Sequence, residues 1–132
     1  MTRNLISIVD DDNAVRKSTK LLVESFGYRV AAFESGESFL KSDQLYETSC
    51  LVVDVEMPGM NGLQLQSHLA AVAHFISVIF ITAYGTKETR RQAMEAGAVA
   101  FLAKPFRDEQ LLRHIRSACS ETRCDDSVYD GL

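Results

Sequence analysis

Five short apolar runs, each followed by a stretch of helical periodicity, limit the folds open to this chain. The runs lie at residues 5–9, 28–33, 51–54, 77–81 and 98–103. Such an alternation predicts a doubly wound, five-stranded parallel α/β sheet whose strands are joined by right-handed crossovers. The chain has 132 residues, which is the usual size of one domain.

The stretches between the runs carry residues that favour the ends of helices. Gly27 and Gly97 stand where a left-handed residue closes a helix. Ser35 can cap a short helix, and Asn61 with Gln64 resembles a capping box. We expect the buried helical stripes to contain Val15, Leu22 and Phe26, then Leu65, Leu69 and Val72, then Leu111, Ile115 and Ala118, with Arg16, Lys17 and Lys20 left for solvent.

Charge and composition argue against several classes of protein. The net charge is −4 at pH 7, unlike the basic surface of a nucleic-acid-binding domain. No apolar run approaches the roughly 20 residues of a membrane span, and the first residues do not read as a signal peptide. Cys50, Cys119 and Cys124 are odd in number and lack the spacing of a metal site. We therefore expect reduced thiols in a cytoplasmic protein.

Polar side chains stand where four of the five runs end. They are Asp10, Asp11 and Asp12 after the first run, Asp54 at the end of the third, Thr82 after the fourth and Lys104 after the fifth. In an open parallel sheet, ligands bind beyond the carboxyl ends of the strands. We therefore expect these side chains to converge at one edge of the sheet.

The acids and the donors at this edge predict a site for a cation and an anion. Helix capping is the plain alternative for the acidic run, but a cap needs one carboxylate, which Asp12 can supply. Asp10 and Asp11 then lie near Asp54, and clustered carboxylates repel unless a cation sits among them. Mg²⁺ is the natural occupant, helped by the backbone carbonyl of Glu56. A facing hydroxyl and ammonium would suit a phosphoryl group.

Four motifs together resemble the response-regulator receiver domain of two-component signalling. They are Val9-Asp10-Asp11, residues 54–62, Ile81-Thr82-Ala83 and Lys104-Pro105-Phe106, in the order and spacing of that family. Residues 59–63 and 97–102 resemble its FixJ-like branch of transcriptional regulators. The resemblance implies a flavodoxin-like (βα)5 fold with strand order 2-1-3-4-5. It implies a receiver domain over residues 1–119. Residues 120–132 carry few apolar positions and two adjacent acids, which indicates a flexible tail or the start of a linker.

The resemblance also implies a role for each residue of the site. Asp54 would accept a phosphoryl group from a phosphohistidine of a sensor histidine kinase. Asp11, Asp54 and the Glu56 carbonyl would bind Mg²⁺, with Asp10 helping through water. Lys104 would pair with Asp54 and then with the phosphoryl oxygens, and its bond to the following proline would be cis.

The output implied by the resemblance is a change of conformation. Thr82 would turn inward to the phosphoryl group and Phe101 would follow, although the family often carries tyrosine in place of Phe101. This would switch a surface made by the fourth helix, fifth strand and last helix, and so control an effector in transcription. The domain would be no enzyme in the usual sense, although it would promote its own phosphorylation and dephosphorylation. Dimer formation on phosphorylation is expected, and direct contact with nucleic acid or membrane is not.

Three other functions compete with this interpretation. One is a degenerate receiver that acts only as an interaction module, but such a domain normally loses a site residue and all are present here. A Mg²⁺-dependent aspartyl-phosphate phosphohydrolase also uses a nucleophilic aspartate at a strand end. That class needs a second acid two residues later, where Glu56 is a near match, and it places this motif on the first strand. A nucleotide- or flavin-binding domain needs a glycine-rich loop after the first strand, where this chain has three aspartates. Glu56 and Tyr84 stand at positions that in the receiver family modulate the lifetime of the phosphorylated state.

Overall fold

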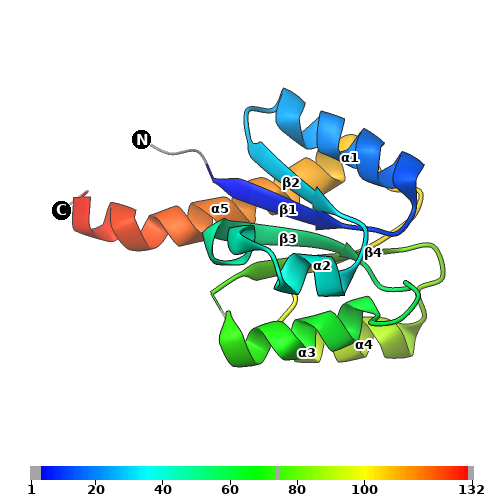
Figure 1. Ribbon diagram of the computed structural model, residues 1–132. Coiled ribbons are helices and arrows are strands. Elements are labelled where there is room, and N and C mark those ends of the chain that lie inside the picture. The colour runs from blue at the N-terminus through cyan, green and yellow to red at the C-terminus, as the bar shows by residue number, and fades with distance from the viewer. Residues whose placement is uncertain (1–3, 74, 131–132) are drawn as a thin grey trace.

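The chain folds around one parallel sheet, as predicted. The computed structural model describes residues 4–73 and 75–130, with side chains of the last helix as far as Cys119. The strands are β1 (Leu5–Val9), β2 (Arg29–Phe33), β3 (Thr48–Asp54), β4 (Ser77–Thr82) and β5 (Ala100–Ala103). They are parallel and lie in the order β2-β1-β3-β4-β5 (Figure 1), which confirms the predicted order.

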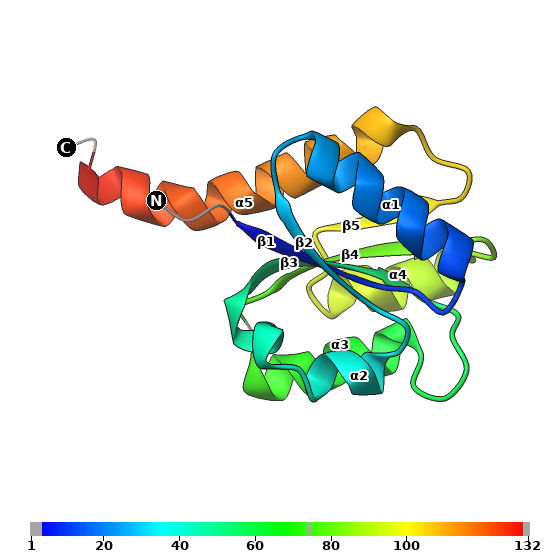
Figure 2. The same ribbon diagram turned by 45° about the horizontal axis from the view of Figure 1, so that its top comes forward.

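Helices cover both faces of the sheet. They are α1 (Asn13–Ser25), α2 (Gly36–Leu40), the 3-10 helix η1 (Asp43–Glu47), α3 (Gly62–Val72), α4 (Lys87–Glu95) and α5 (Asp108–Asp130). Helices α1 and α5 lie on one face, and α2, α3 and α4 lie on the other (Figures 1 and 2). The element η1 was not predicted, because its five residues show no apolar period.

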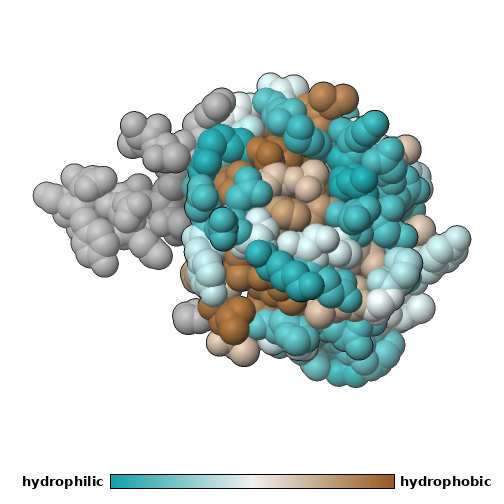
Figure 3. Space-filling view, in the orientation of Figure 1, coloured by the Kyte–Doolittle hydropathy of each residue, from teal (hydrophilic) through white to brown (hydrophobic). Residues whose placement is uncertain are grey.

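The sheet separates two apolar cores, and β3 contributes to both. Leu51 and Val53 pack under α2, α3 and α4, whereas Cys50 and Val52 pack under α1 and α5. A strand buried on both faces reads as a continuous apolar run, which is the pattern of this segment. On the face shown in Figure 3, hydrophilic residues cover most of the surface and apolar residues show between them in small groups.

The predicted helix ends are confirmed. The Asp12 carboxylate accepts hydrogen bonds from the backbone N–H groups of the first turn of α1, and Ser35 caps α2. Asn61 and Gln64 form both bonds of a capping box at α3. Gly27 has a φ of 94° and Gly97 a φ of 102°, so both close a helix in the left-handed region.

Two of the predicted apolar stripes are partly wrong. Phe26 is 56% exposed, and α1 instead buries Thr19 and Val23 against the sheet. Val72 is 54% exposed. Both exposed residues stand at the C-terminal end of their helix, just before the segment that leads to the next strand. The stripe of α5 is confirmed, because Leu111, Ile115 and Ala118 are all buried.

The last helix is longer than predicted. It continues to Asp130, so the segment predicted as a flexible tail is helical over residues 120–130. The reason is local, since the sequence has no glycine or proline between Asp108 and Asp130 to end the helix. Residues 131–132 lie outside the described part of the chain. The alternative, that this segment begins a linker, stays a prediction. In the described part, no helix has the length and apolar character needed to cross a membrane.

Gly62 opens α3 directly behind Asp54, and it leaves no room for a side chain. A Cβ at this position would lie 2.7 Å from the carbonyl oxygen of Asp54 and 3.0 Å from the ring of Phe80. We expect Gly62→Ala to lower the free energy of unfolding by about 1–3 kcal/mol through overpacking.

Denaturant unfolding followed by circular dichroism measures this loss. Ser67→Ala is the matched control, because it is exposed on the same helix and should leave stability within about 0.5 kcal/mol. A Gly62→Ala variant as stable as the wild type would show that the start of α3 can move away from the backbone of Asp54 without loss of stability.

Candidate functional site

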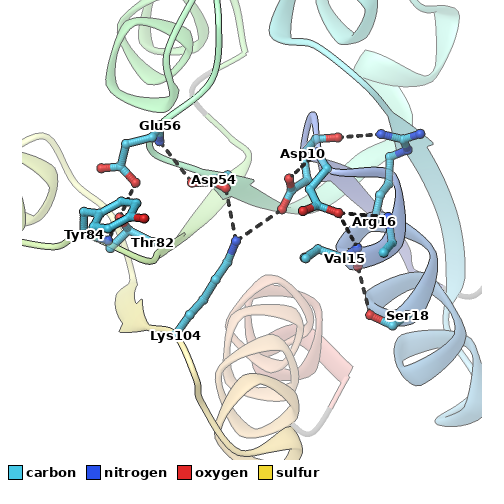
Figure 4. Close-up of polar contacts among 11 residues, drawn as sticks. Asp10, Val15, Arg16, Ser18, Asp54, Glu56, Thr82, Tyr84 and Lys104 are labelled. Carbon is cyan, nitrogen blue, oxygen red and sulfur yellow. Dashed lines mark hydrogen bonds and ion pairs between the residues drawn. The ribbon is translucent and has the colours of Figure 1, made fainter.

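The sheet brings the predicted polar residues together at its carboxyl edge. Asp54 ends β3 and pairs with Ile81 of β4, so the next residue, Thr82, lies one step beyond it. Asp10 follows β1, the other neighbour of β3, and Lys104 follows β5. Figure 4 shows Asp10, Asp54 and Lys104 turned toward one another.

Three carboxylates share this edge. Oxygens of Asp10, Asp11 and Asp54 lie within 4.8 Å of one another. The side chain of Asp10 is wholly buried and that of Asp54 is 10% exposed, whereas Asp11 is exposed. Backbone N–H groups hold the two buried acids, since Asp12 donates to Asp10 Oδ1 at 2.9 Å and Glu56 donates to Asp54 Oδ1 at 3.0 Å.

Lys104 is the cation that faces these acids. Its Nζ lies 3.1 Å from Asp54 Oδ2 and 3.7 Å from Asp10 Oδ2. Its backbone N–H donates to the carbonyl of Thr82 at 2.8 Å, which ties the end of β5 to the end of β4. The peptide bond between Lys104 and Pro105 is cis, as predicted.

One ammonium group does not neutralise the cluster. Burial raises the pKa of Asp54 and of Asp10, and it outweighs the lowering effect of Lys104 and of the backbone hydrogen bonds. Burial lowers the pKa of Lys104, but the hydrogen bond and the charge of Asp54 outweigh it and raise that pKa overall. The ammonium therefore stays charged, and the carboxylates still resist full ionisation.

The donor set fits a hard divalent cation. Asp10 Oδ2 is buried and accepts no hydrogen bond from the described residues, and its ion pair with Lys104 is long, at 3.7 Å. Carboxylate oxygens are the ligands that Mg²⁺ prefers. A cation bound between these acids would offset the burial that raises the pKa of Asp10 and of Asp54.

Thr82 lies at the same edge, but its hydroxyl forms its hydrogen bonds with residues outside the group of Asp10, Asp54 and Lys104. It donates a hydrogen bond to the carboxylate of Glu56 and accepts one from the backbone N–H of Tyr84 at 3.1 Å (Figure 4). Phe101 is buried beside it, with its ring centroid 6.4 Å from that of Phe80. Both side chains lie close to Gly85, since a Cβ at that position would lie 2.9 Å from Thr82 Cγ2 and 2.9 Å from Phe101 Cε1.

Arg16 contacts the site, although the sequence indicated a solvated side chain. Its Nη1 donates to the backbone carbonyl of Asp10 at 2.7 Å, and its Nη2 donates to Asn13 Oδ1 at 2.6 Å. The guanidinium thereby braces the loop that carries Asp10 and Asp11. Its position one turn into α1, after an acidic loop, was the signal available in the sequence.

Known proteins share both the sequence and the fold of this chain. Residues 6–116 match the family described as the response regulator receiver domain. Nodulation protein W of Bradyrhizobium diazoefficiens is 42% identical over 92% of this chain. Transcriptional regulatory protein FixJ of the same species is 36% identical over 89%. This chain spans 54% of the first protein and 57% of the second, about half the length of each.

The solved structures agree with the sequence matches. The crystal structure of the FixJ N-terminal part superposes with a TM-score of 0.81 at 36% identity, covering 89% of this chain and 94% of that one. The five-stranded sheet of this chain thus belongs to a known architecture.

Proposed function

The chain belongs to the family of response-regulator receiver domains, and from this we propose that Asp54 accepts a phosphoryl group from a phosphohistidine of a sensor histidine kinase. The observation that carries the proposal is the set of groups around the Asp54 carboxylate. Its carboxylate has an ammonium group at 3.1 Å, a backbone donor at 3.0 Å and two further acids alongside. These neighbours support the proposal, because a phosphoacceptor needs a counter-charge and acids that can hold a cation beside it.

Beyond the nucleophile, the protein needs to supply little covalent chemistry. An oxygen of Asp54 attacks the phosphorus atom, the bond from phosphorus to the imidazole nitrogen breaks, and the electron pair stays on the imidazole. Such transfers depend mainly on positioning and on stabilisation of charge. The backbone N–H of Glu56 holds one Asp54 oxygen in place, while the other faces Lys104.

Asp10, Asp11 and Asp54, with the backbone carbonyl of Glu56, are the residues proposed to hold Mg²⁺. When bound, this ion would neutralise the acids and the oxygens of the incoming phosphoryl group. The buried oxygen of Asp10 that accepts no hydrogen bond and the spacing of the three acids support this assignment. Arg16 and the capped start of α1 keep the two N-terminal acids in place.

We propose that the signal leaves the site through Thr82 and Phe101. Thr82 would exchange its present partner for a phosphoryl oxygen, and Phe101 would move with it and alter the surface of α4, β5 and α5. In support, α4 buries only Ala93 among its described residues, as expected of an element that moves at low cost. Relatives named as transcriptional regulators favour an effector in transcription. Dimer formation and action in the cytoplasm are further proposals that rest on the family.

The rival phosphohydrolase function is less well supported. Such enzymes need a second acid free to act as general acid and base beside the nucleophile. The Glu56 carboxylate is instead bonded to Thr82. The Asp54 motif also lies on the third strand in sequence rather than the first.

Incubation with acetyl phosphate and Mg²⁺ tests the proposal. We expect the intact mass of the chain to increase by one phosphoryl group, and hydroxylamine to remove it, because an acyl phosphate is the product. The same sample should not turn over a small phosphate ester. Sustained turnover of the ester would favour the phosphohydrolase, and an unchanged mass would contradict the phosphoacceptor role.

A further inference from the structure

The side chain of Glu56 accepts a hydrogen bond from the hydroxyl of Thr82. We infer that this bond, called the latch below, must break before Thr82 can bind the phosphoryl group. The inference rests on the proposed role of Asp54 as acceptor. Glu56 is then a positioning residue: its carboxylate sets the conformation of Thr82 and makes no bond to phosphorus. Its removal should favour the phosphorylated form.

The hydrogen-bonding capacity of Thr82 is the physical basis of the latch. A threonine hydroxyl has one proton to donate. Thr82 donates that proton in its hydrogen bond to the Glu56 carboxylate, and the hydroxyl also accepts from the Tyr84 N–H at 3.1 Å. Thr82 is fully buried, so water cannot readily replace a lost partner. The hydroxyl therefore cannot donate to a phosphoryl oxygen while it donates to Glu56.

The latch depends on the Glu56 side chain alone, because backbone hydrogen bonds hold the loop around it. The N–H of Val55 donates to the carbonyl of Ile81 at 3.0 Å, which joins the end of β3 to β4. The N–H of Glu56 donates to Asp54. Neither bond involves the side chain of Glu56, and Glu56 is exposed. Truncation of this side chain should therefore leave the acidic site and its cation-binding carbonyl in place.

Glu56 acts in a second way through its charge. A carboxylate next to Thr82 repels the oxygens of any phosphoryl group that Thr82 would bind. The hydrogen bond and the charge both favour the phosphate-free form, but they can be separated. Glu56→Gln removes the charge and keeps an oxygen that can accept from Thr82, whereas Glu56→Ala removes both.

The probe is beryllofluoride, which binds a carboxylate as a phosphoryl group would, at a fixed saturating concentration of Mg²⁺. We expect Glu56→Ala to bind it about threefold to tenfold more tightly than the wild type, since a net hydrogen bond changes an equilibrium by about that factor. Glu56→Gln should show a smaller gain. Glu34→Ala is the control, because it removes an exposed acid after β2 at the same edge, and it should bind as the wild type does.

A double-mutant cycle separates the hydrogen bond from the charge. In a Thr82→Val background the bond is already absent, so Glu56→Ala should bring no more than the gain seen with Glu56→Gln. Nuclear magnetic resonance should also report the latch without any probe bound. In Glu56→Ala the Tyr84 amide signal should shift and the Thr82 side chain should populate a second rotamer.

The outcomes distinguish this inference from the function on which it rests. A wild-type chain that binds Mg²⁺ but not beryllofluoride would remove the proposed function and the latch with it. A wild-type chain that binds beryllofluoride, together with a Glu56→Ala variant of equal affinity, would overturn the latch alone. A full gain that persists in the Thr82→Val background would also overturn it, because charge would then explain the whole effect.

Discussion

Asp54→Asn should abolish the gain of mass that acetyl phosphate and Mg²⁺ produce. An asparagine amide is no nucleophile toward phosphorus, and the neighbouring acids are not placed to replace it. Asp10 is wholly buried and accepts from the Asp12 N–H, and Asp11 lies exposed at the rim. The change should be a loss of reaction, not of folding, because the asparagine oxygen can still accept from the Glu56 N–H.

Intact-mass spectrometry after a fixed time of incubation measures this loss. Glu34→Gln is the control, since it removes one exposed acid that follows β2 and should react as the wild type does. A circular dichroism spectrum like that of the wild type is needed for both variants. Phosphoryl incorporation into a folded Asp54→Asn variant at the wild-type rate would remove the proposed nucleophile.

Lys104→Ala should separate cation binding from phosphoryl transfer. The ammonium group lies 3.1 Å from Asp54 and 3.7 Å from Asp10, so its loss leaves more negative charge for a cation. Mg²⁺ binding should therefore persist or strengthen. Phosphorylation should slow about a hundredfold, the size of effect seen when one charge-stabilising donor is removed from a site. The remaining phosphorylated chain should signal poorly, because the phosphoryl oxygens lack their contact to β5.

A Mg²⁺ titration and the rate of mass gain together test this prediction. Lys17→Ala is the control, because Lys17 is an exposed lysine on α1 and contacts neither acid. The signal is read from the amide resonances of α4, β5 and α5 after beryllofluoride is added. A Lys104→Ala variant with wild-type kinetics and an unchanged response would contradict the role given to Lys104.

The position of the site followed from the sequence because it depends on backbone order alone. Parallel strands end at one edge, so the residues after each apolar run had to meet there once the alternation was recognised. Asp10, Asp54, Thr82 and Lys104 were found in this way. The helix caps were predictable for a similar reason, since a cap is decided within four or five residues.

The directions of side chains were not predictable in this way. Arg16 turns back to the Asp10 carbonyl, and the Thr82 hydroxyl turns to Glu56. Each choice depends on partners that only the folded sheet brings near. The predicted burial of Phe26 was wrong for a different reason, because helical periodicity does not show where the buried part of a helix ends. The length of α5 was hidden by its polar composition, although the absence of glycine and proline was visible.

The direct test of the central claim is to find which residue carries the phosphoryl group. After reaction with acetyl phosphate and Mg²⁺, borohydride reduces an aspartyl phosphate to homoserine, and peptide mass spectrometry locates the change. We predict conversion at Asp54, with Asp10, Asp11 and Asp12 unaltered, and none when Mg²⁺ is removed by a chelator. Conversion at another residue, or equal conversion without Mg²⁺, would contradict a cation-dependent acceptor site built around Asp54.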